Sequence, residues 1–254
     1  MERREFIALT AAGLAWNMLP HPAGQPQTRA IGPREIKAVA FDAFPIFDPR
    51  PINALAEELF PGRGLALSNE WRTRQFEYTW LRVAARRYAD FWQVTQDALV
   101  FAAHKLQLDL SREKRETLMN AYLTLKAWPD VQPAVTALKQ SGLRLALLSN
   151  FTPRMLAVNI KNAGLDGLFE HVLSTDPAGT YKPDPNGYQL GIDAFRLKRH
   201  EILFVAFAGW DAAGAKLFGY PTYWVNRLQL PVEELGAAPD GEGTSLLPMV
   251  QFLS

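Results

Sequence analysis

Short apolar runs alternate with longer amphipathic segments along most of the chain. The first run covers residues 36–43 and carries Asp42 near its carboxyl end. Later apolar runs predict strands at 143–148, 171–174, 202–206 and 222–225. Helical patterns between them predict helices at 131–141, 153–163, 185–195 and 211–218. Because parallel strands need crossovers of this length, the pattern predicts an α/β fold with a doubly wound, mostly parallel sheet.

The stretch 52–127 interrupts this alternation. It carries helical patterning with almost no strand signal, and it comes soon after the first strand. We therefore expect a helical cap over residues 50–128, inserted into an α/β core built from 36–49 and 129–254. Such a cap would lie over the carboxyl ends of the strands, where open α/β sheets bind ligands.

Composition and charge narrow the class of function. With 254 residues, of which 48% are hydrophobic and 21% charged, the chain can bury a sizeable core. The formal net charge is +1 and basic residues are interleaved with acidic ones, so nucleic acid is not an expected partner. The four histidines are scattered and cysteine is absent, so we expect no zinc site, no disulfide framework and no thiol nucleophile.

Residues 1–30 have the character of a leader segment. Arg3 and Arg4 are followed by one spacer, by Phe6 and by a short apolar stretch, and several prolines come next. This order resembles a twin-arginine export signal, which predicts a periplasmic protein. The apolar stretch is too short to span a bilayer, so stable membrane insertion is not expected. The alternative is an amphipathic leading helix on a cytoplasmic protein.

Polar side chains follow the predicted strands at one end. Asp42 ends the first strand, Ser149 and Asn150 end the second, and Lys182 and Asp211 follow the third and the fourth. Each has a structural explanation when taken singly, because an acid can cap a turn, Ser-Asn can lead into a helix, and a loop lysine can be solvated. Since carboxyl ends of parallel strands share one edge, together they predict one crevice that pairs a nucleophile with a lysine.

The motifs around these residues carry a family resemblance. From Ile36 to Leu247 the chain resembles the type II (S)-2-haloacid dehalogenases of the haloacid dehalogenase superfamily. The cap motif at 71–82 distinguishes this subgroup from the phosphatases of the superfamily. The matching segments are 41–43, 60–64, 71–72, 75–82, 148–150, 181–184, 210–215 and 224–227.

The resemblance implies a covalent mechanism. Asp42 would displace halide from C2 of a short haloacid, and water would then open the aspartyl ester. Lys182 would keep Asp42 ionised and oriented, and Asp211 would pair with Lys182. Ser149 and the backbone of Asn150 would hold the carboxylate of the substrate.

The resemblance also assigns roles to the cap and to the walls of the pocket. Arg72 would cradle the departing halide, although the arginines around it could equally form the solvated face of a cap helix. Apolar side chains would strip water from the nucleophile, which strengthens the charge interactions inside. The substrate contacts implied in this way are Ala43, Phe44, Phe76, Phe91, Asn150, Tyr188 and Trp210.

Position 44 separates the implied chemistry from phosphoryl transfer. Superfamily phosphatases carry a second aspartate two residues after the nucleophile, which protonates an alkoxide, and this chain has Phe44 there. Halide leaves as a stable anion and needs no such proton. The resemblance therefore implies no metal and no cofactor, a small-molecule 2-haloacid as substrate, and a homodimer.

Three polar positions of the family are missing around the nucleophile. Pro45 stands where the family has Gly-Thr, and Ala206 and Ala208 stand where it has serine and asparagine. Ile46 cannot supply the missing hydroxyl. Because these groups serve the hydrolytic water, a catalytically impaired member that binds a small carboxylate stays open as an alternative. A superfamily phosphatase is the second alternative, and Phe44 argues against it.

Overall fold

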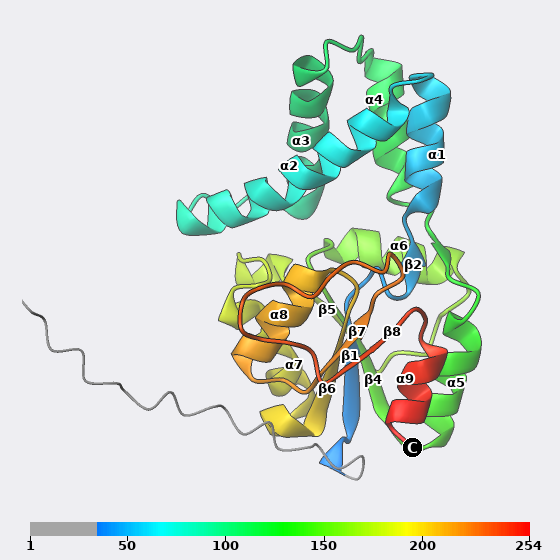
Figure 1. The fold of residues 1–254 in the computed structure, drawn as a ribbon, viewed down its shortest axis with the longest axis vertical. Coiled ribbons are helices and arrows are strands. Elements are labelled where there is room, and N and C mark those ends of the chain that lie inside the picture. The colour runs from blue at the N-terminus through cyan, green and yellow to red at the C-terminus, as the bar shows by residue number, and fades with distance from the viewer. Residues whose placement is uncertain (1–34) are drawn as a thin grey trace, which may run out of the picture. The chain divides into compact units, whose positions relative to one another are not determined.

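The computed structural model describes residues 35–254, and the leader predicted at 1–30 lies outside the described residues. Within 35–254, none of the helices combines the length and the apolar character that crossing a bilayer requires. The strands of the main sheet are β1 (Ala38–Phe41), β4 (Arg144–Ser149), β5 (His171–Ser174), β6 (Ile202–Ala206), β7 (Thr222–Val225) and β8 (Gly241–Gly243). The helices that follow these strands or lead into them are α5 (Val131–Gln140), α6 (Pro153–Asn162), α7 (Pro185–Phe195), α8 (Gly209–Phe218) and α9 (Leu247–Phe252) (Figure 1).

The main sheet is parallel throughout. Its strand order is β5-β4-β1-β6-β7-β8, and β1 pairs with β4 on one side and with β6 on the other. The predicted α/β class with a doubly wound sheet is therefore confirmed. The sequence pattern missed β8, because its Gly-Glu-Gly sequence offers no apolar alternation and only its pairing with β7 makes it a strand.

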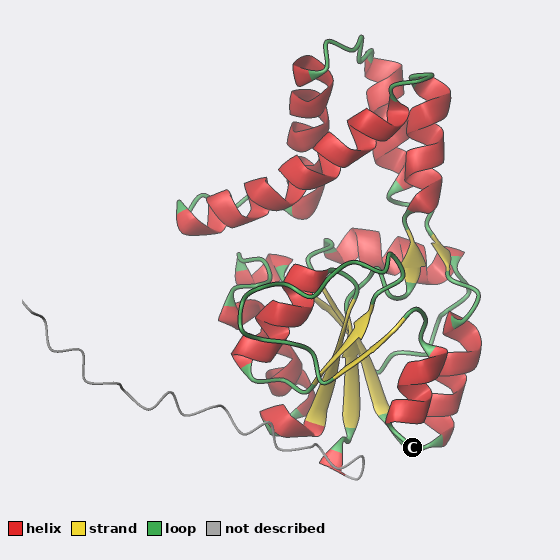
Figure 2. Ribbon diagram, viewed as in Figure 1, coloured by secondary structure: helices red, strands yellow, loops and turns green. Residues whose placement is uncertain are grey.

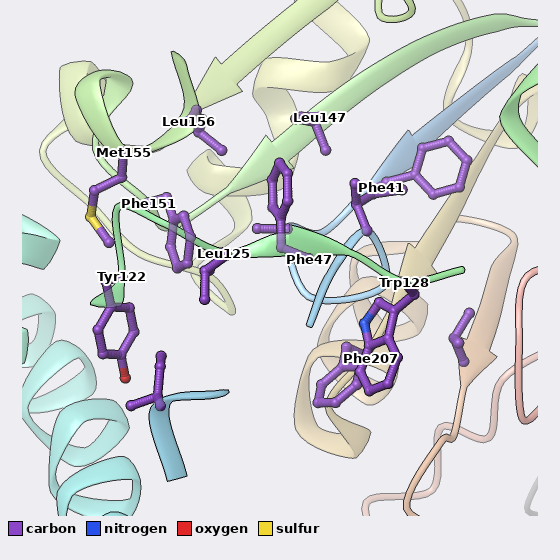
Figure 3. Close-up of a cluster of buried hydrophobic side chains, with 14 of the residues drawn as sticks. Phe41, Phe47, Tyr122, Leu125, Trp128, Leu147, Phe151, Met155, Leu156 and Phe207 are labelled. Atoms are coloured by element: carbon purple, nitrogen blue, oxygen red, sulfur yellow. The ribbon is translucent and has the colours of Figure 1, made fainter. Parts of the chain in front are cut away.

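Strand side chains alternate between two apolar layers. Val39 and Phe41 of β1 belong to the cluster that contains α5, α6 and α9, whereas Ala38 and Ala40 belong to the cluster that contains α7 and α8. Figure 3 shows part of the first cluster, in which Phe41 and Leu147 of the sheet lie among other buried side chains, several of them aromatic. Both faces of the sheet are thus covered, as a parallel sheet requires.

Four helices are inserted after β1. They are α1 (Arg50–Leu59), α2 (Gly64–Ala84), α3 (Phe91–Lys105) and α4 (Arg112–Ala121), and we call them the cap. The chain enters the cap through β2 (Phe47–Asp48) and returns through β3 (Lys126–Ala127), and these two strands pair antiparallel (Figure 2). Trp128 closes this ribbon, because its backbone N–H donates to Ile46 O at 3.0 Å and its indole N–H donates to Phe44 O at 2.9 Å.

One glycine allows the first two cap helices to pack closely. Gly64 begins α2, and a Cβ atom at this position would lie 2.2 Å from Glu57 Cα on α1. No side chain fits in that space, so packing within the cap requires glycine at position 64, whereas Gly62 has open space around it and is favoured by its positive φ of 72°.

Asn159 ties α6 to the segment that returns from the cap. Its side chain is fully buried, and Oδ1 accepts from Leu125 N–H at 2.9 Å. Its Nδ2 donates to Tyr122 O at 2.8 Å and to Met155 O at 2.9 Å. The amide therefore satisfies backbone groups that have no access to water.

We expect Asn159→Ala to lower the free energy of unfolding by about 2–4 kcal/mol, because it leaves buried backbone groups without partners. Urea denaturation measures this loss. Asn162→Ala is the matched control, since Asn162 Nδ2 donates to Leu123 O at 2.8 Å from an exposed position where water can replace it. We expect the control to lose about 0.5 kcal/mol, and equal losses in the two variants would contradict the assignment.

Candidate active site

The carboxyl ends of β1, β4 and β6 meet the cap around a cavity that we call the Asp42 cavity. It measures about 340 Å³, counting its mouth, which opens to solvent. Its lining residues are Asp42, Phe44, Arg72, Phe76, Phe91, Ser149, Asn150, Phe151, Phe207, Ala208, Trp210 and Asp211. The structure thus brings together most of the site residues predicted from the sequence, although they come from five separate segments of the chain.

A buried ammonium group lies between two carboxylates at this cavity. Lys182 is only 1% exposed, and its Nζ lies 3.0 Å from Asp42 Oδ1 and 2.6 Å from Asp211 Oδ2. The same Nζ lies 4.7 Å from the centre of the Phe204 ring, so an aromatic side chain packs against the ammonium group. Two carboxylates thus share one ammonium group, which holds Asp42 in place.

Burial and ion pairing shift the pKa values of Lys182 and Asp211 in opposite directions. Burial lowers the pKa of Lys182, but the charges of Asp211 and Asp42 outweigh burial and raise this pKa above its ordinary value. Burial raises the pKa of Asp211 to about 6, and Lys182 opposes the rise. Asp211 is therefore ionised at neutral pH and can accept from the ammonium.

Tyr188 supports this arrangement from behind the cavity. Its hydroxyl donates to Asp211 Oδ1 at 2.7 Å, and burial followed by the charge of Asp211 raises the pKa of Tyr188 well above its ordinary value. The phenol therefore keeps its proton and acts as a donor. Asp211 also lies in the first turn of α8, where the helix dipole favours a negative charge.

A tight turn fixes the other oxygen of the nucleophile candidate. Asp42 donates its backbone N–H to Val205 O at 2.9 Å, which extends the pairing of β1 with β6 by one residue. Its Oδ2 accepts from Phe44 N–H at 3.1 Å, in the manner of an Asx turn. Both carboxylate oxygens are thus oriented, one by Lys182 and one by the backbone.

The end of β4 supplies the Ser149 hydroxyl to the cavity and the Asn150 side chain to the loop that carries Lys182. Ser149 Oγ accepts from Phe151 N–H at 3.1 Å, which leaves its own proton free to bind a ligand. Asn150 Oδ1 accepts from Lys182 N–H at 2.8 Å and from the Thr175 hydroxyl at 3.2 Å. The Asn150 side chain therefore positions the loop that carries Lys182.

Arg72 brings a positive charge from the cap to the cavity. Its guanidinium carbon lies 5.8 Å from the centre of the Phe207 ring. Desolvation by the surrounding protein lowers the pKa of Arg72, while Tyr122 and the negative charge of Asp42 oppose this change. The neighbouring arginines differ, since Arg74 pairs with Glu77 at 2.8 Å and Arg82 pairs with Asp97 at 2.9 Å within the cap.

Aromatic side chains close the walls. Phe76 of the cap and Trp210 of α8 have ring centres 5.1 Å apart, and Phe91 of the cap lies 5.5 Å from Phe151. Phe151 and Phe207 also line the cavity, but they were not predicted from the sequence. Each comes just after the end of a strand, and this position could have identified both as lining residues. Ala43 packs in the hydrophobic core and its side chain does not line the Asp42 cavity.

The three positions where the sequence predicts missing polar groups carry apolar side chains in the structure. Ala206 and Ile46 are fully buried, and Ala208 lines the cavity with a methyl group. Phe44, two residues after Asp42, also lines it. Among residues 35–254, no three histidine, aspartate or glutamate side chains gather as a metal site would require.

We expect Lys182→Met to destabilise the fold in a pH-dependent way. Without the ammonium, the buried carboxylates of Asp42 and Asp211 take pKa values above those of the unfolded chain. The folded state then binds more protons than the unfolded state, so the free energy of unfolding falls as pH rises between the unfolded and the folded pKa. Urea denaturation should show a loss of about 3–5 kcal/mol at about pH 8 and a smaller loss at about pH 5.

Lys216→Met serves as the control for this measurement. Lys216 Nζ pairs with Asp240 Oδ1 at 2.6 Å, and both side chains are partly exposed. Loss of this pair should cost less than about 1 kcal/mol, with little difference between the two pH values. A pH-independent loss in Lys182→Met would show that the site does not depend on the buried charge balance.

Comparisons with known proteins agree with this geometry. Residues 36–219 match the model of the haloacid dehalogenase-like hydrolases. The chain is 45% identical over 218 residues to the (S)-2-haloacid dehalogenase of Pseudomonas sp. (strain YL), covering 85% of this chain and 94% of that protein. It is 40% identical over 208 residues to haloacetate dehalogenase H-2 of Moraxella sp. (strain B), covering 82% and 93%.

Solved structures give the same result. The L-2-haloacid dehalogenase RSc1362 superposes with a TM-score of 0.85 at 44% identity, over 86% of this chain and 98% of that chain. The L-2-haloacid dehalogenase from Xanthobacter autotrophicus, with chloropropionic acid covalently bound, superposes with a TM-score of 0.78 at 33% identity, over 86% and 98%. The chain therefore belongs to the (S)-2-haloacid dehalogenases, within the haloacid dehalogenase-like hydrolases.

Proposed function

We propose that the protein hydrolyses short-chain (S)-2-haloalkanoic acids through a covalent ester of Asp42, with release of halide. The observation that carries this proposal is the contact between Lys182 Nζ and Asp42 Oδ1, 3.0 Å long, at the wall of a cavity that also holds Arg72. A carboxylate held by a buried cation, opposite a second cation, is suited to displace one anion with another.

The first step forms a bond between a carboxylate oxygen of Asp42 and C2 of the substrate. The bond between C2 and the halogen breaks, and the halide leaves with the electron pair towards Arg72. The Ser149 hydroxyl and the backbone at Asn150 hold the substrate carboxylate away from the negative nucleophile. The aromatic walls exclude water, which would otherwise solvate the nucleophile and lower its reactivity.

The second step regenerates the enzyme. Water attacks the carbonyl carbon of the Asp42 ester, and the bond between that carbon and the ester oxygen breaks. One proton of the water passes to the ester oxygen, which leaves in the 2-hydroxy acid, and the other passes to solvent, so Asp42 is again a carboxylate. Lys182 stabilises the negative charge that develops on the carbonyl oxygen. Ala206, Ala208 and Ile46 offer this water no hydrogen-bonding side chain, so ester hydrolysis is the slower step.

The Asp42→Asn variant tests the nucleophile. We expect it to lose halide release in the first turnover with (S)-2-chloropropionate, because an amide oxygen does not displace halide. Rapid-quench halide assays measure this release. Asp48→Asn is the matched control, since both aspartates are 9% exposed and Asp48 pairs with Arg50 outside the cavity. Release by Asp42→Asn at the rate of the wild type would remove Asp42 from the mechanism.

The same assay on the wild type tests whether ester hydrolysis is slower than ester formation. We expect a burst of one halide per active site, followed by a slower steady state, with the ester visible as an adduct on the peptide that contains Asp42. Loss of one well-placed donor slows such a step by about 10²–10³-fold.

An adduct without turnover would indicate the impaired alternative, and neither adduct nor halide would indicate a carboxylate binder. Mg²⁺-dependent cleavage of p-nitrophenyl phosphate would indicate a phosphatase.

We also propose that the protein is exported to the periplasm and forms a homodimer. Export is supported by the order Arg3-Arg4, spacer, Phe6 and apolar stretch in the sequence. The homodimer is supported by the tendency of the family. Cell fractionation of an Arg3→Lys, Arg4→Lys double variant tests export, and light scattering after gel filtration tests the assembly.

A further inference from the structure

A second cavity adjoins the Asp42 cavity, and we call it the Ser68 cavity. It measures about 560 Å³, counting its mouth, and it lies between α1, α2 and the core. The two cavities share four lining residues, so these side chains lie between the two spaces: Phe44, Arg72, Phe76 and Phe207. A group that reaches past Arg72 from the nucleophile would therefore enter the Ser68 cavity.

The Ser68 cavity contains a polar group without a partner. Ser68 is only 6% exposed, and its hydroxyl has no hydrogen-bond partner among the described residues. Leaving a buried hydroxyl unsatisfied costs free energy. The Ser68 hydroxyl oxygen is itself enclosed, so an acceptor bound in the cavity would recover this free energy once the Ser68 side chain rotates towards it. Asn53 and Asn69 place further donors on the same lining.

The other buried polar groups of this lining are held by one another. Trp71 Nε1 donates to Thr95 O at 2.7 Å, and Gln75 Nε2 donates to Thr95 Oγ1 at 2.7 Å and to the Tyr122 hydroxyl at 3.4 Å. Burial raises the pKa of Tyr122 to about 12, so its hydroxyl stays neutral. This network fixes the wall and leaves Ser68 as the free buried donor.

Apart from the cation of Arg72 and the two asparagines, the remaining lining is apolar, and it carries no negative charge. Ile52, Trp71 and Phe76 offer surface for methylene groups, and no carboxylate lies among the lining residues of this cavity. The combination of apolar walls with one unpaired buried donor suits an organic chain that bears a hydrogen-bond acceptor. A free halide ion would fill little of this space.

We propose that the Ser68 cavity is a subsite for the substituent on C2 of the substrate, and that the Ser68 hydroxyl binds an acceptor atom in that substituent. The preferred substrates are then 2-haloacids whose side chain is longer than methyl and carries an ether, carbonyl or similar oxygen. This inference rests on the proposed dehalogenation for its substrate class, but the binding of the chain itself does not require turnover.

Two halogen-free acids of equal chain length test the subsite without chemistry. Hexanoate has an apolar chain, and 4-methoxybutanoate replaces one methylene of that chain by an ether oxygen. Protein-observed NMR titration gives both dissociation constants. We expect Ser68→Ala to weaken 4-methoxybutanoate about 3- to 10-fold and to leave hexanoate within about twofold. Ser141→Ala, an exposed serine outside the cavity lining, should change neither.

Turnover of the corresponding acids separates this inference from the proposed function. In the wild type, kcat/KM should be higher for (S)-2-chloro-4-methoxybutanoate than for (S)-2-chloropropionate, and Ser68→Ala should reduce the first and spare the second. If Ser68→Ala weakens both halogen-free acids equally, or if the wild type binds neither, the subsite is wrong. If ether discrimination persists while no halide is released from any substrate, the subsite stands and the dehalogenation is contradicted.

Discussion

The site depends on one buried cation held between two carboxylates. Removing Lys182 from water costs several kcal/mol, and its short contacts with Asp42 and Asp211 offset that cost. The pairing has a functional result, because a carboxylate that remains ionised in an apolar pocket is a stronger nucleophile than one in water. Tyr188 and the N-terminus of α8 add to this by stabilising the charge on Asp211, so Lys182 is shared and does not neutralise Asp42 alone.

The fold places these groups by topology. β1, β4 and β6 are neighbours in a parallel sheet, so residues that follow them at their carboxyl ends share one edge. The cap adds what the sheet lacks, namely a second cation and aromatic walls. The Phe76–Trp210 ring pair joins cap and core at the cavity, and the Tyr88 hydroxyl, between α2 and α3, donates to Asp176 Oδ1 of the core at 2.6 Å.

The local part of this architecture could be predicted from the sequence. Asp42, Ser149 and Lys182 could be found because strand ends are visible as the limits of apolar runs. β8 and the Ser68 cavity could not, because pairing of a glycine-rich segment and packing between cap helices depend on contacts distant in sequence. The role of the Asn150 side chain was also hidden, since only the folded chain brings it to the backbone of Lys182.

The ribbon formed by β2 and β3 has an evolutionary consequence. Because Phe47 lies opposite Ala127, the chain leaves the sheet and rejoins it at nearly the same point. An insertion anchored in this way closes its own loop and imposes little entropic cost on the rest of the molecule. The helices between β2 and β3 can therefore be lengthened, replaced or lost while the strands of the main sheet keep their register. The range of substrates can then diverge while the residues at the strand ends stay unchanged.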